Sequence, residues 1–228
     1  MDFALVLKQS WPMLLEGLKV TLIISLLSIA IGMVIGLISC LMGLSKLKIV
    51  KAISAVYVWI IRGTPMIVQA FIVYYGIPIV VQQFNPNFII SEFLAGTITL
   101  SLNAGAYLSE IFRSGIQAVD KGQIEASRSL GISSGKTMFK VVLPQAFKIT
   151  IPSIVNQFII TIKDTSILSV ISLAELCNQA KQYSASTYRF FEVYILVGLC
   201  YLAIISLLMI LSKYVEKKIS YDRKSKNN

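Results

Sequence analysis

Long runs without charge are the feature that most constrains what this chain can fold into. No Asp, Glu, Lys or Arg occurs from Val20 to Ser45, from Gly63 to Ser91, or from Val193 to Ser212. A helix needs about 20 apolar residues to cross a bilayer. Only 14% of the 228 residues are charged, whereas ordinary soluble domains have about 25%. The sequence therefore predicts an all-α polytopic membrane protein.

Two more apolar stretches raise the predicted number of transmembrane helices to five. Phe93–Ser109 carries no charge, and Ile149–Ile162 is followed, after Lys163 and Asp164, by a second apolar stretch. The second and fourth spans exceed the minimal length, so each can tilt or break. The first run is too long for the core of a signal peptide, and we expect it to be retained. We predict a single transmembrane domain, 1–228, with spans at about 18–43, 53–82, 93–115, 143–172 and 191–212.

Basic residues predict the orientation of these spans. They gather between the first and second spans, between the third and fourth, and in the C-terminal tail, whereas the other two loops hold only Lys181 and Arg189. Positive charge concentrates on the cytoplasmic side of a membrane, which predicts an outside N-terminus and a cytoplasmic C-terminus. The net charge of +10 mostly reflects this asymmetry, so we expect no nucleic-acid partner.

The residue types needed for most site chemistry are scarce. The chain has no histidine, the commonest general base and metal ligand. Its three cysteines, Cys40, Cys177 and Cys200, form no CxxC pair and are typical of small apolar core residues. We therefore predict no metal site and no histidine-based catalytic triad, which excludes membrane hydrolases of those types.

The segment GISSGKT, residues 131–137, looks at first like a phosphate-binding loop. Such a loop has four residues between its glycines and follows a buried strand, but Gly131 and Gly135 are separated by three and follow a polar helical stretch. Asp120 is instead expected to cap a helix, with Gln123 at capping-box spacing. Gly131 suits the left-handed residue that ends a helix. We predict a helix, a glycine turn and a second helix in a cytoplasmic loop at about 120–140.

Four segments of the chain together resemble one family. They are RGTPMIVQAFIVYYGIP (Arg62–Pro78), AYLSEIFRSGIQAVDKGQIEAS (Ala106–Ser127), KDTSILSVI (Lys163–Ile171), and the EAA-like pattern that runs from Glu125-Ala126-Ser127 through Gly131 to Leu143-Pro144. Together they resemble the permeases of polar amino-acid ABC importers, of the histidine, glutamine or arginine type. Ser127 stands where the family usually has a second alanine. Pro144 is expected early in the fourth span, where a missing amide hydrogen is tolerated.

The resemblance implies a type I ABC importer permease fold with a cytoplasmic coupling helix. It implies uptake of a polar amino acid by alternating access, powered by a separate cytoplasmic ATPase that binds ATP and Mg. It also implies that this chain binds no cofactor, has no catalytic residue and is not an enzyme. The expected partners are a second permease subunit, identical or related, two ABC ATPase subunits, an extracytoplasmic solute-binding protein and membrane lipid. The expected location is the bacterial cytoplasmic membrane.

The resemblance also assigns a docking role to the loop at 120–140. Glu125 is expected either to pair with a basic residue of the ATPase or only to stabilise the start of its helix through the dipole. The residues predicted to contact the ATPase are Gly122, Glu125, Ala126, Ser127, Leu130 and Gly131.

Polar residues inside the spans suggest a substrate pathway. Charged residues there cost about 2.5–3.5 kcal/mol each at a helix centre and usually face a cavity or each other. Some of the polar side chains are three or four residues apart and so share a helix face. Alternatively, Lys163 and Asp164 neutralise each other, and the hydroxyls bond to the preceding turn. The predicted pathway residues are Asn103, Tyr107, Glu110, Lys163, Asp164, Thr165 and Ser166.

A break is predicted in the second span at Arg62, Gly63, Thr64 and Pro65. It could act as a hinge, as a gate or only in packing. Two other functions stay open on the residues alone. One is a secondary transporter or channel for a small polar solute, although internal repeats are common in that class and we find none. The other is a structural or receptor-type membrane protein, which would not need polar residues inside its spans.

Overall fold

The computed structural model describes residues 2–225, and it is all-α as the sequence predicts. The described residues contain helices and turns and no strand. The elements are α1 (Phe3–Gly43), α2 (Lys48–Gly63), α3 (Met66–Phe71), the π-helix η1 (Ile72–Gly76), α4 (Ile77–Gln82), α5 (Glu92–Gln117), α6 (Lys121–Ser129), α7 (Ser134–Thr137), the π-helix η2 (Met138–Val142), α8 (Leu143–Asp164), the 3₁₀-helix η3 (Thr165–Ile171), α9 (Leu176–Thr187) and α10 (Phe190–Ser225).

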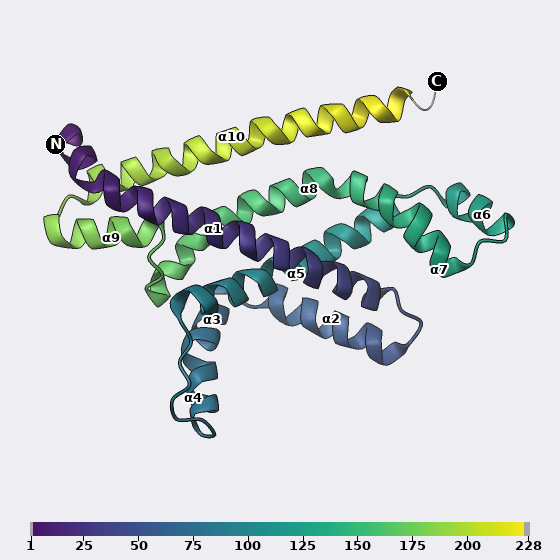
Figure 1. Ribbon diagram of the computed structural model, residues 1–228, viewed down its shortest axis with the longest axis horizontal. Coiled ribbons are helices and arrows are strands. Elements are labelled where there is room, and N and C mark those ends of the chain that lie inside the picture. Colours follow the sequence, from purple (N-terminus) through teal and green to yellow (C-terminus); the bar gives the residue numbers. More distant parts are fainter. Residues whose placement is uncertain (1, 226–228) are drawn as a thin grey trace.

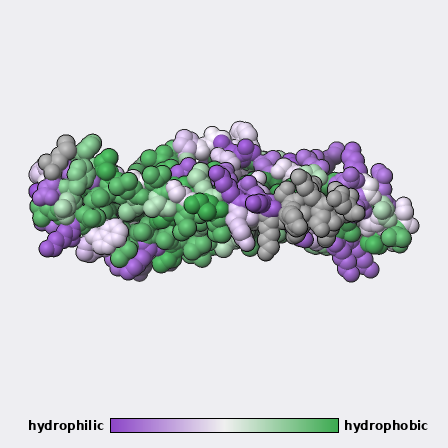
Figure 2. Space-filling model, turned by 90° about the horizontal axis from the view of Figure 1, so that it is seen from above, coloured by the Kyte–Doolittle hydropathy of each residue, from purple (hydrophilic) through white to green (hydrophobic). Residues whose placement is uncertain are grey.

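The longest helices run side by side along the length of the molecule (Figure 1). The N-terminus and α9 lie at one end. The α1–α2 turn, α6 and the C-terminal part of α10 lie at the other, while α3 and α4 turn away from the bundle (Figure 1). Figure 2 shows a broad hydrophobic area on one face, with hydrophilic residues more frequent toward both ends. This distribution fits helices that lie in a membrane with their ends in water.

Close packing of α1 on α5 forms the centre of the bundle. Glycines make this approach possible, because a side chain would collide with the facing helix. A Cβ atom placed on Gly36 of α1 would lie 2.8 Å from the Cβ of Leu108 and 2.9 Å from the carbonyl oxygen of Gly105. Small residues at such contacts allow membrane helices to pack tightly without a hydrophobic driving force.

Not every predicted span is equally apolar in the part of the chain that is described. Three stretches are long and apolar enough to cross a membrane, namely Phe3–Gly43, Ser134–Ile171 and Phe190–Tyr214, and the bent pair Lys48–Gly63 with Met66–Gln82 makes a fourth. The helix α5 is long enough, but it buries polar residues between α1, α2 and α8. A helix shielded from lipid needs less apolar surface. The five-span count and the orientation stay predictions.

Pro144 is the second residue of α8, and its expected place early in the fourth span stays a prediction. The helical conformation continues from Ser134 through α7, η2 and α8, so Pro144 lies inside a continuous helix. It has no N–H to donate, and its ring would clash with the carbonyl group four residues earlier. The π-turn before it relieves this clash, with the N–H of Leu143 donating to the carbonyl oxygen of Met138. The π-helix η1 precedes Pro78 in the same way.

Candidate functional site

The predicted docking helix exists as α6, a nine-residue helix that begins at Lys121. The Asp120 carboxylate caps it by accepting a hydrogen bond of 2.6 Å from the N–H of Gly122. The backbone N–H of Gln123 donates to the Asp120 carbonyl oxygen at 3.1 Å. No bond from the Gln123 side chain completes the capping box among the described residues. Asp120 therefore fixes the start of α6 by itself, at the same end of the molecule as the α1–α2 turn (Figure 1).

Gly131 ends α6 in the left-handed conformation that the sequence predicts, with φ of +78°. The N–H of Gly131 donates to the Arg128 carbonyl oxygen at 3.0 Å, and the N–H of Ile132 donates to the Ser127 carbonyl oxygen at 3.3 Å. This pair of bonds is a Schellman motif, which reverses the chain within a few residues. Gly131 thus sets the angle at which α6 meets α7.

The predicted docking residues divide into an outer and an inner set. Glu125 and Ala126 are exposed, and Leu130 is 80% exposed although it is apolar. Ser127 is only 5% exposed, and its hydroxyl group lies 2.9 Å from that of Thr137. Ser127 therefore holds α6 against the next helix, and its predicted contact with the ATPase stays a prediction.

Glu125 lies in the middle of α6, beyond the Asp120 cap. The dipole effect is confined to the first turn of a helix, so it does not account for an acid at this place. Glu125 forms no ion pair with the described part of the chain. Its exposed carboxylate is consistent with pairing with an external basic group, which stays a prediction.

The predicted break in the second span lies between α2 and α3, where α2 and the segment Met66–Gln82 are bent by 106°. Thr64 and Pro65 are extended there, with ψ of 145° and 137°. Proline disfavours helical conformation in the residue before it, so α2 ends at Gly63. The Thr64 hydroxyl group donates to the carbonyl oxygen of Ile60 at 2.8 Å and helps to close the end of α2.

Gln69 holds this bend together, and the sequence analysis missed it. Its side-chain nitrogen lies 2.8 Å from the Ile61 carbonyl oxygen, 3.1 Å from the Thr64 carbonyl oxygen and 2.9 Å from the Thr64 hydroxyl oxygen. Its side chain is buried. Carbonyl groups at a helix end have no partner within the helix, and Gln69 supplies one from across the bend. A lone glutamine in the apolar run after Pro65 was the available signal.

The bend is joined to the polar face predicted on α5. The side-chain nitrogen of Asn103 donates to the side-chain oxygen of Gln69 at 3.4 Å. The Arg62 guanidinium group lies 5.2 Å from the centre of the Tyr107 ring, within the range of a cation–π contact. The predicted hinge and two of the predicted pathway residues therefore form one connected group.

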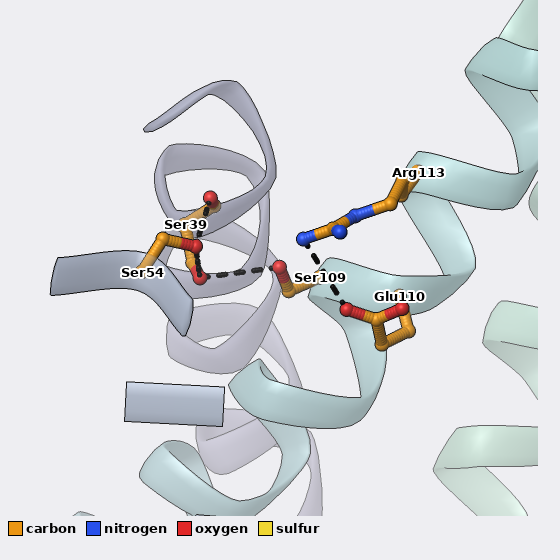
Figure 3. Close-up of polar contacts among 5 residues, drawn as sticks. All are labelled: Ser39, Ser54, Ser109, Glu110 and Arg113. Atoms are coloured by element: carbon orange, nitrogen blue, oxygen red, sulfur yellow. Dashed lines mark hydrogen bonds and ion pairs between the residues drawn. The ribbon is translucent and has the colours of Figure 1, made fainter. Parts of the chain in front are cut away.

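Glu110 takes part in a different group, nearer the α1–α2 turn (Figure 3). Its carboxylate lies 3.4 Å from the Arg113 guanidinium group. Beside this pair, the hydroxyl group of Ser39 lies 2.9 Å from that of Ser54 and 3.1 Å from that of Ser109. These serines come from α1, α2 and α5, so they anchor the first part of α2 while the bend lies farther along it.

The four pathway residues predicted around residue 164 lie where α8 changes into η3. Thr165 is buried and donates to the Ile162 carbonyl oxygen at 2.8 Å. Ser166 donates to the Lys163 carbonyl oxygen at 2.7 Å. Both hydroxyl groups thus bond to the preceding turn, as the alternative interpretation expects. Lys163 and Asp164 do not form an ion pair in the described structure.

The two predicted pathway groups lie on elements that pack together. Leu168 and Ile171 of η3 share an apolar cluster with Ala70 of α3 and Leu100 of α5. No polar contact joins Asp164 to Asn103 among the described residues. The amide of Asn103 and the ring of Tyr107 thus lie at the bend, and the Asp164 carboxylate lies at the end of α8, just before η3.

Comparison with known proteins identifies the family of this fold. Residues 32–221 match the model of the binding-protein-dependent transport system inner membrane component family. The arginine transport system permease protein ArtQ of Bacillus subtilis is 40% identical over 219 residues, which cover 96% of this chain and 97% of ArtQ. The L-cystine transport system permease protein TcyB of the same organism is 39% identical, over 94% of this chain and 90% of TcyB.

Solved structures agree with these sequence relatives. A crystal structure of an amino acid ABC transporter with histidines superposes with a TM-score of 0.87 at 38% identity, over 96% of this chain and 99% of the other. An inward-facing MetNI methionine ABC transporter shares the fold, with a TM-score of 0.76 at 20% identity over 91% of this chain and 96% of the other. The fold is therefore that of a type I ABC permease, and the resemblance found in the sequence is confirmed. This chain belongs to the family of binding-protein-dependent transport system inner membrane components.

Proposed function

We propose that this chain carries a polar amino acid across the cytoplasmic membrane of a bacterium by alternating access, driven by ATP hydrolysis in a separate ATPase subunit. Its family and relatives make it the permease subunit of an amino-acid ABC importer. To this we add the polar nature of the substrate, its pathway through the chain and the assembly of the subunits. Arginine, cystine and histidine appear in the names of the relatives and of the similar structure, and all three are polar.

The connection between the bend and α5 is the observation that carries the proposed mechanism. From α3, Gln69 bonds to Ile61 and Thr64 at the end of α2, and it accepts a bond from Asn103 of α5. A change in the angle between α2 and α3 therefore has to break the bonds of Gln69 to the end of α2 or its contact with Asn103. Membrane transporters commonly bind substrate where helices are broken. We expect Asp164 to receive the substrate ammonium group, and Asn103 or backbone amides to receive its carboxylate.

The end of the molecule that carries α6, the predicted docking helix, supports coupling to an ATPase. Leu130 projects into solvent and Glu125 stands free beside the Schellman turn, which suits a helix that inserts into a groove of a partner. The basic segments predicted to be cytoplasmic gather at the same end of the molecule (Figure 1). ATP and Mg would bind in that partner, and this chain would supply neither catalytic group nor cofactor ligand.

The arm formed by α3 and α4 supports pairing with a second permease subunit. Its apolar side chains are widely exposed, and in the loop after it Phe84 and Ile89 are 86% and 84% exposed. Exposed apolar surface of this kind marks lipid or protein contacts. A solute-binding protein would deliver substrate at the opposite end of the molecule, where the N-terminus and α9 lie (Figure 1).

Purification from native membranes tests this function. An affinity-tagged chain in mild detergent should bring down an ABC ATPase, and uptake by cells should be lowered by an excess of unlabelled arginine, histidine, glutamine or cystine. A secondary transporter would purify without an ATPase and would keep its uptake after cellular ATP is depleted. That result would refute the proposal.

A further inference from the structure

Glu175 is a buried acidic residue that the pathway described above does not use. It has no exposed surface, although it precedes α9 in a turn between two helices. One carboxylate oxygen accepts from the N–H of Asn178 at 2.6 Å, and the other accepts from the N–H of Cys177 at 2.9 Å. The second oxygen also accepts from the Tyr201 hydroxyl group of α10 at 3.3 Å. Glu175 therefore caps α9 and ties it to α10.

A carboxylate buried in this way needs compensation for its lost hydration. No Lys or Arg forms an ion pair with Glu175 within the described residues. Its compensation consists of the two backbone N–H groups and the Tyr201 hydroxyl group. Capping alone would use only the backbone groups, and an exposed Asp or Ser would do that as well. The bond to Tyr201 is the part that capping does not explain.

The turn that holds Glu175 follows directly from η3. Its backbone is bonded on both sides, since the N–H of Leu173 donates to the Leu168 carbonyl oxygen at 3.3 Å and the Asn178 side chain donates to the Leu173 carbonyl oxygen at 2.7 Å. On the other side, the N–H of Leu176 donates to the Thr21 hydroxyl group of α1 at 3.2 Å. The position of Glu175 therefore fixes how η3 enters the bundle.

Tyr201 joins this turn to α10. Its hydroxyl group donates to the Glu175 carboxylate at 3.3 Å, and the backbone N–H of Glu175 donates to the Leu173 carbonyl oxygen at 2.8 Å. The N–H of Leu173 in turn donates to the Leu168 carbonyl oxygen of η3. A series of hydrogen bonds therefore leads from Tyr201 through Glu175 to η3, the segment that directly follows Asp164.

We propose that Glu175 is a positioning residue for transport, which acts through Tyr201 to hold η3, and with it Asp164 and Thr165, in place along the pathway. The inference rests on the proposed function, because only there does this segment contact substrate. It assigns a role to a residue nine positions beyond Ser166, the nearest member of the predicted pathway set.

Two small substitutions separate positioning from capping. Tyr201→Phe removes only the hydroxyl group. Glu175→Asp keeps a carboxylate at a good capping position, but its side chain is one methylene shorter and is drawn away from Tyr201. Glu92→Gln is the matched control, because the Glu92 carboxylate also accepts a tyrosine hydroxyl bond, from Tyr74 at 3.0 Å, at a site outside the pathway.

Hydrogen exchange read by mass spectrometry reports the position of η3 without any ligand. In the purified permease–ATPase complex, both variants should exchange the amides of 165–171 at least tenfold faster than the wild type. The amides of α9 should stay protected in Glu175→Asp, and the Glu92→Gln control should match the wild type throughout. The double variant should equal the faster single variant, because both remove the same contact.

Uptake into proteoliposomes gives the functional readout, with a mixture of radiolabelled L-arginine, L-histidine, L-glutamine and L-cystine as the probe. We expect at least a tenfold loss of uptake in both variants, with basal ATPase activity and thermal midpoint close to wild type. Unchanged exchange in η3, or wild-type uptake by Glu175→Asp and Tyr201→Phe, would overturn the inference. Failure of the wild-type complex to take up any probe would refute the proposed function instead, and the exchange of η3 would still decide whether Glu175 positions it.

Discussion

Replacing Gln69 with leucine tests how the bend in the second span is maintained. The side-chain nitrogen of Gln69 lies within 3.1 Å of three acceptor oxygens on Ile61 and Thr64, and its oxygen accepts from Asn103. An amide NH₂ group has two hydrogens, so it satisfies two of the three acceptors at a time. Leucine has a similar volume and supplies no hydrogen bond, so Gln69→Leu removes the bonds with little change in packing.

The free energy that the substitution is expected to cost follows from these hydrogen bonds. Two lost hydrogen bonds amount to about 1–3 kcal/mol, and the buried Asn103 amide left without its partner adds about 1–3 kcal/mol. The bent arrangement of α2 and α3 should therefore lose about 2–6 kcal/mol relative to alternative arrangements. Since about 1.4 kcal/mol corresponds to a factor of ten, the population ratio shifts roughly 30-fold or more.

Pulsed electron–electron spin resonance measures this shift. Spin labels at Trp59 of α2 and Ile79 of α4, which are 74% and 64% exposed, lie on either side of the bend. In lipid nanodiscs, Gln69→Leu should broaden or displace the distance distribution between the labels, and uptake should fall. Gln82→Leu is the control, because Gln82 makes one exposed bond of 2.8 Å to the Phe88 carbonyl oxygen. Identical distributions in wild type and Gln69→Leu would refute the reasoning.

Three more experiments test other parts of the structure. Gly36→Leu should lower the thermal midpoint in detergent, because its side chain has no room against α5 and overpacking costs about 1–3 kcal/mol; Gly198→Leu, with nothing within 4 Å of its Cβ position, should not. Glu125→Lys combined with Gly131→Pro should insert normally yet lose ATPase co-purification and coupled uptake; wild-type uptake would contradict the docking role. Asp164→Asn should weaken binding of radiolabelled substrate about 10- to 100-fold, since a charge-assisted bond contributes about 1.5–3 kcal/mol; unchanged affinity would remove Asp164 from the site.

Local signals in the sequence predicted the docking segment well. Asp120 and Gly131 act through bonds and backbone conformations within a few residues of themselves, which a sequence displays directly. The side of α6 that each residue faces depends on α7 and on the turn between them. The bond of the Ser127 hydroxyl group to Thr137 was therefore not apparent in the sequence.

Long-range contacts explain most of what the sequence did not reveal. The Thr64-Pro65 pair predicted a break, but its angle of 106° depends on Gln69, whose partners lie across the bend and on α5. The π-turn before Pro144 likewise has no motif of its own, because it is the response of a continuous helix to a proline. The burial of Glu175 likewise depends on helices distant in the sequence, because α1 packs against it near Gly17 and Tyr201 of α10 bonds to it.

The third predicted span, which corresponds to α5, shows how packing affects the interpretation of hydropathy. The helix α5 buries Thr97, Thr99 and Ser101 among neighbouring helices, so hydropathy alone understates its place in the bundle. The same burial makes it a suitable wall for a polar pathway. An apolar composition identifies helices that face lipid, whereas a transporter also needs helices that are shielded from lipid and can carry polar residues.

Uptake by the reconstituted complex tests the central claim most directly. The permease, its co-purified ATPase and its solute-binding protein would be placed in proteoliposomes that enclose ATP, and the entry of radiolabelled amino acid would be measured. We predict uptake that requires both hydrolysable ATP and the binding protein, and that a proton or sodium gradient does not replace. Uptake driven by such a gradient in vesicles without ATP would contradict the account.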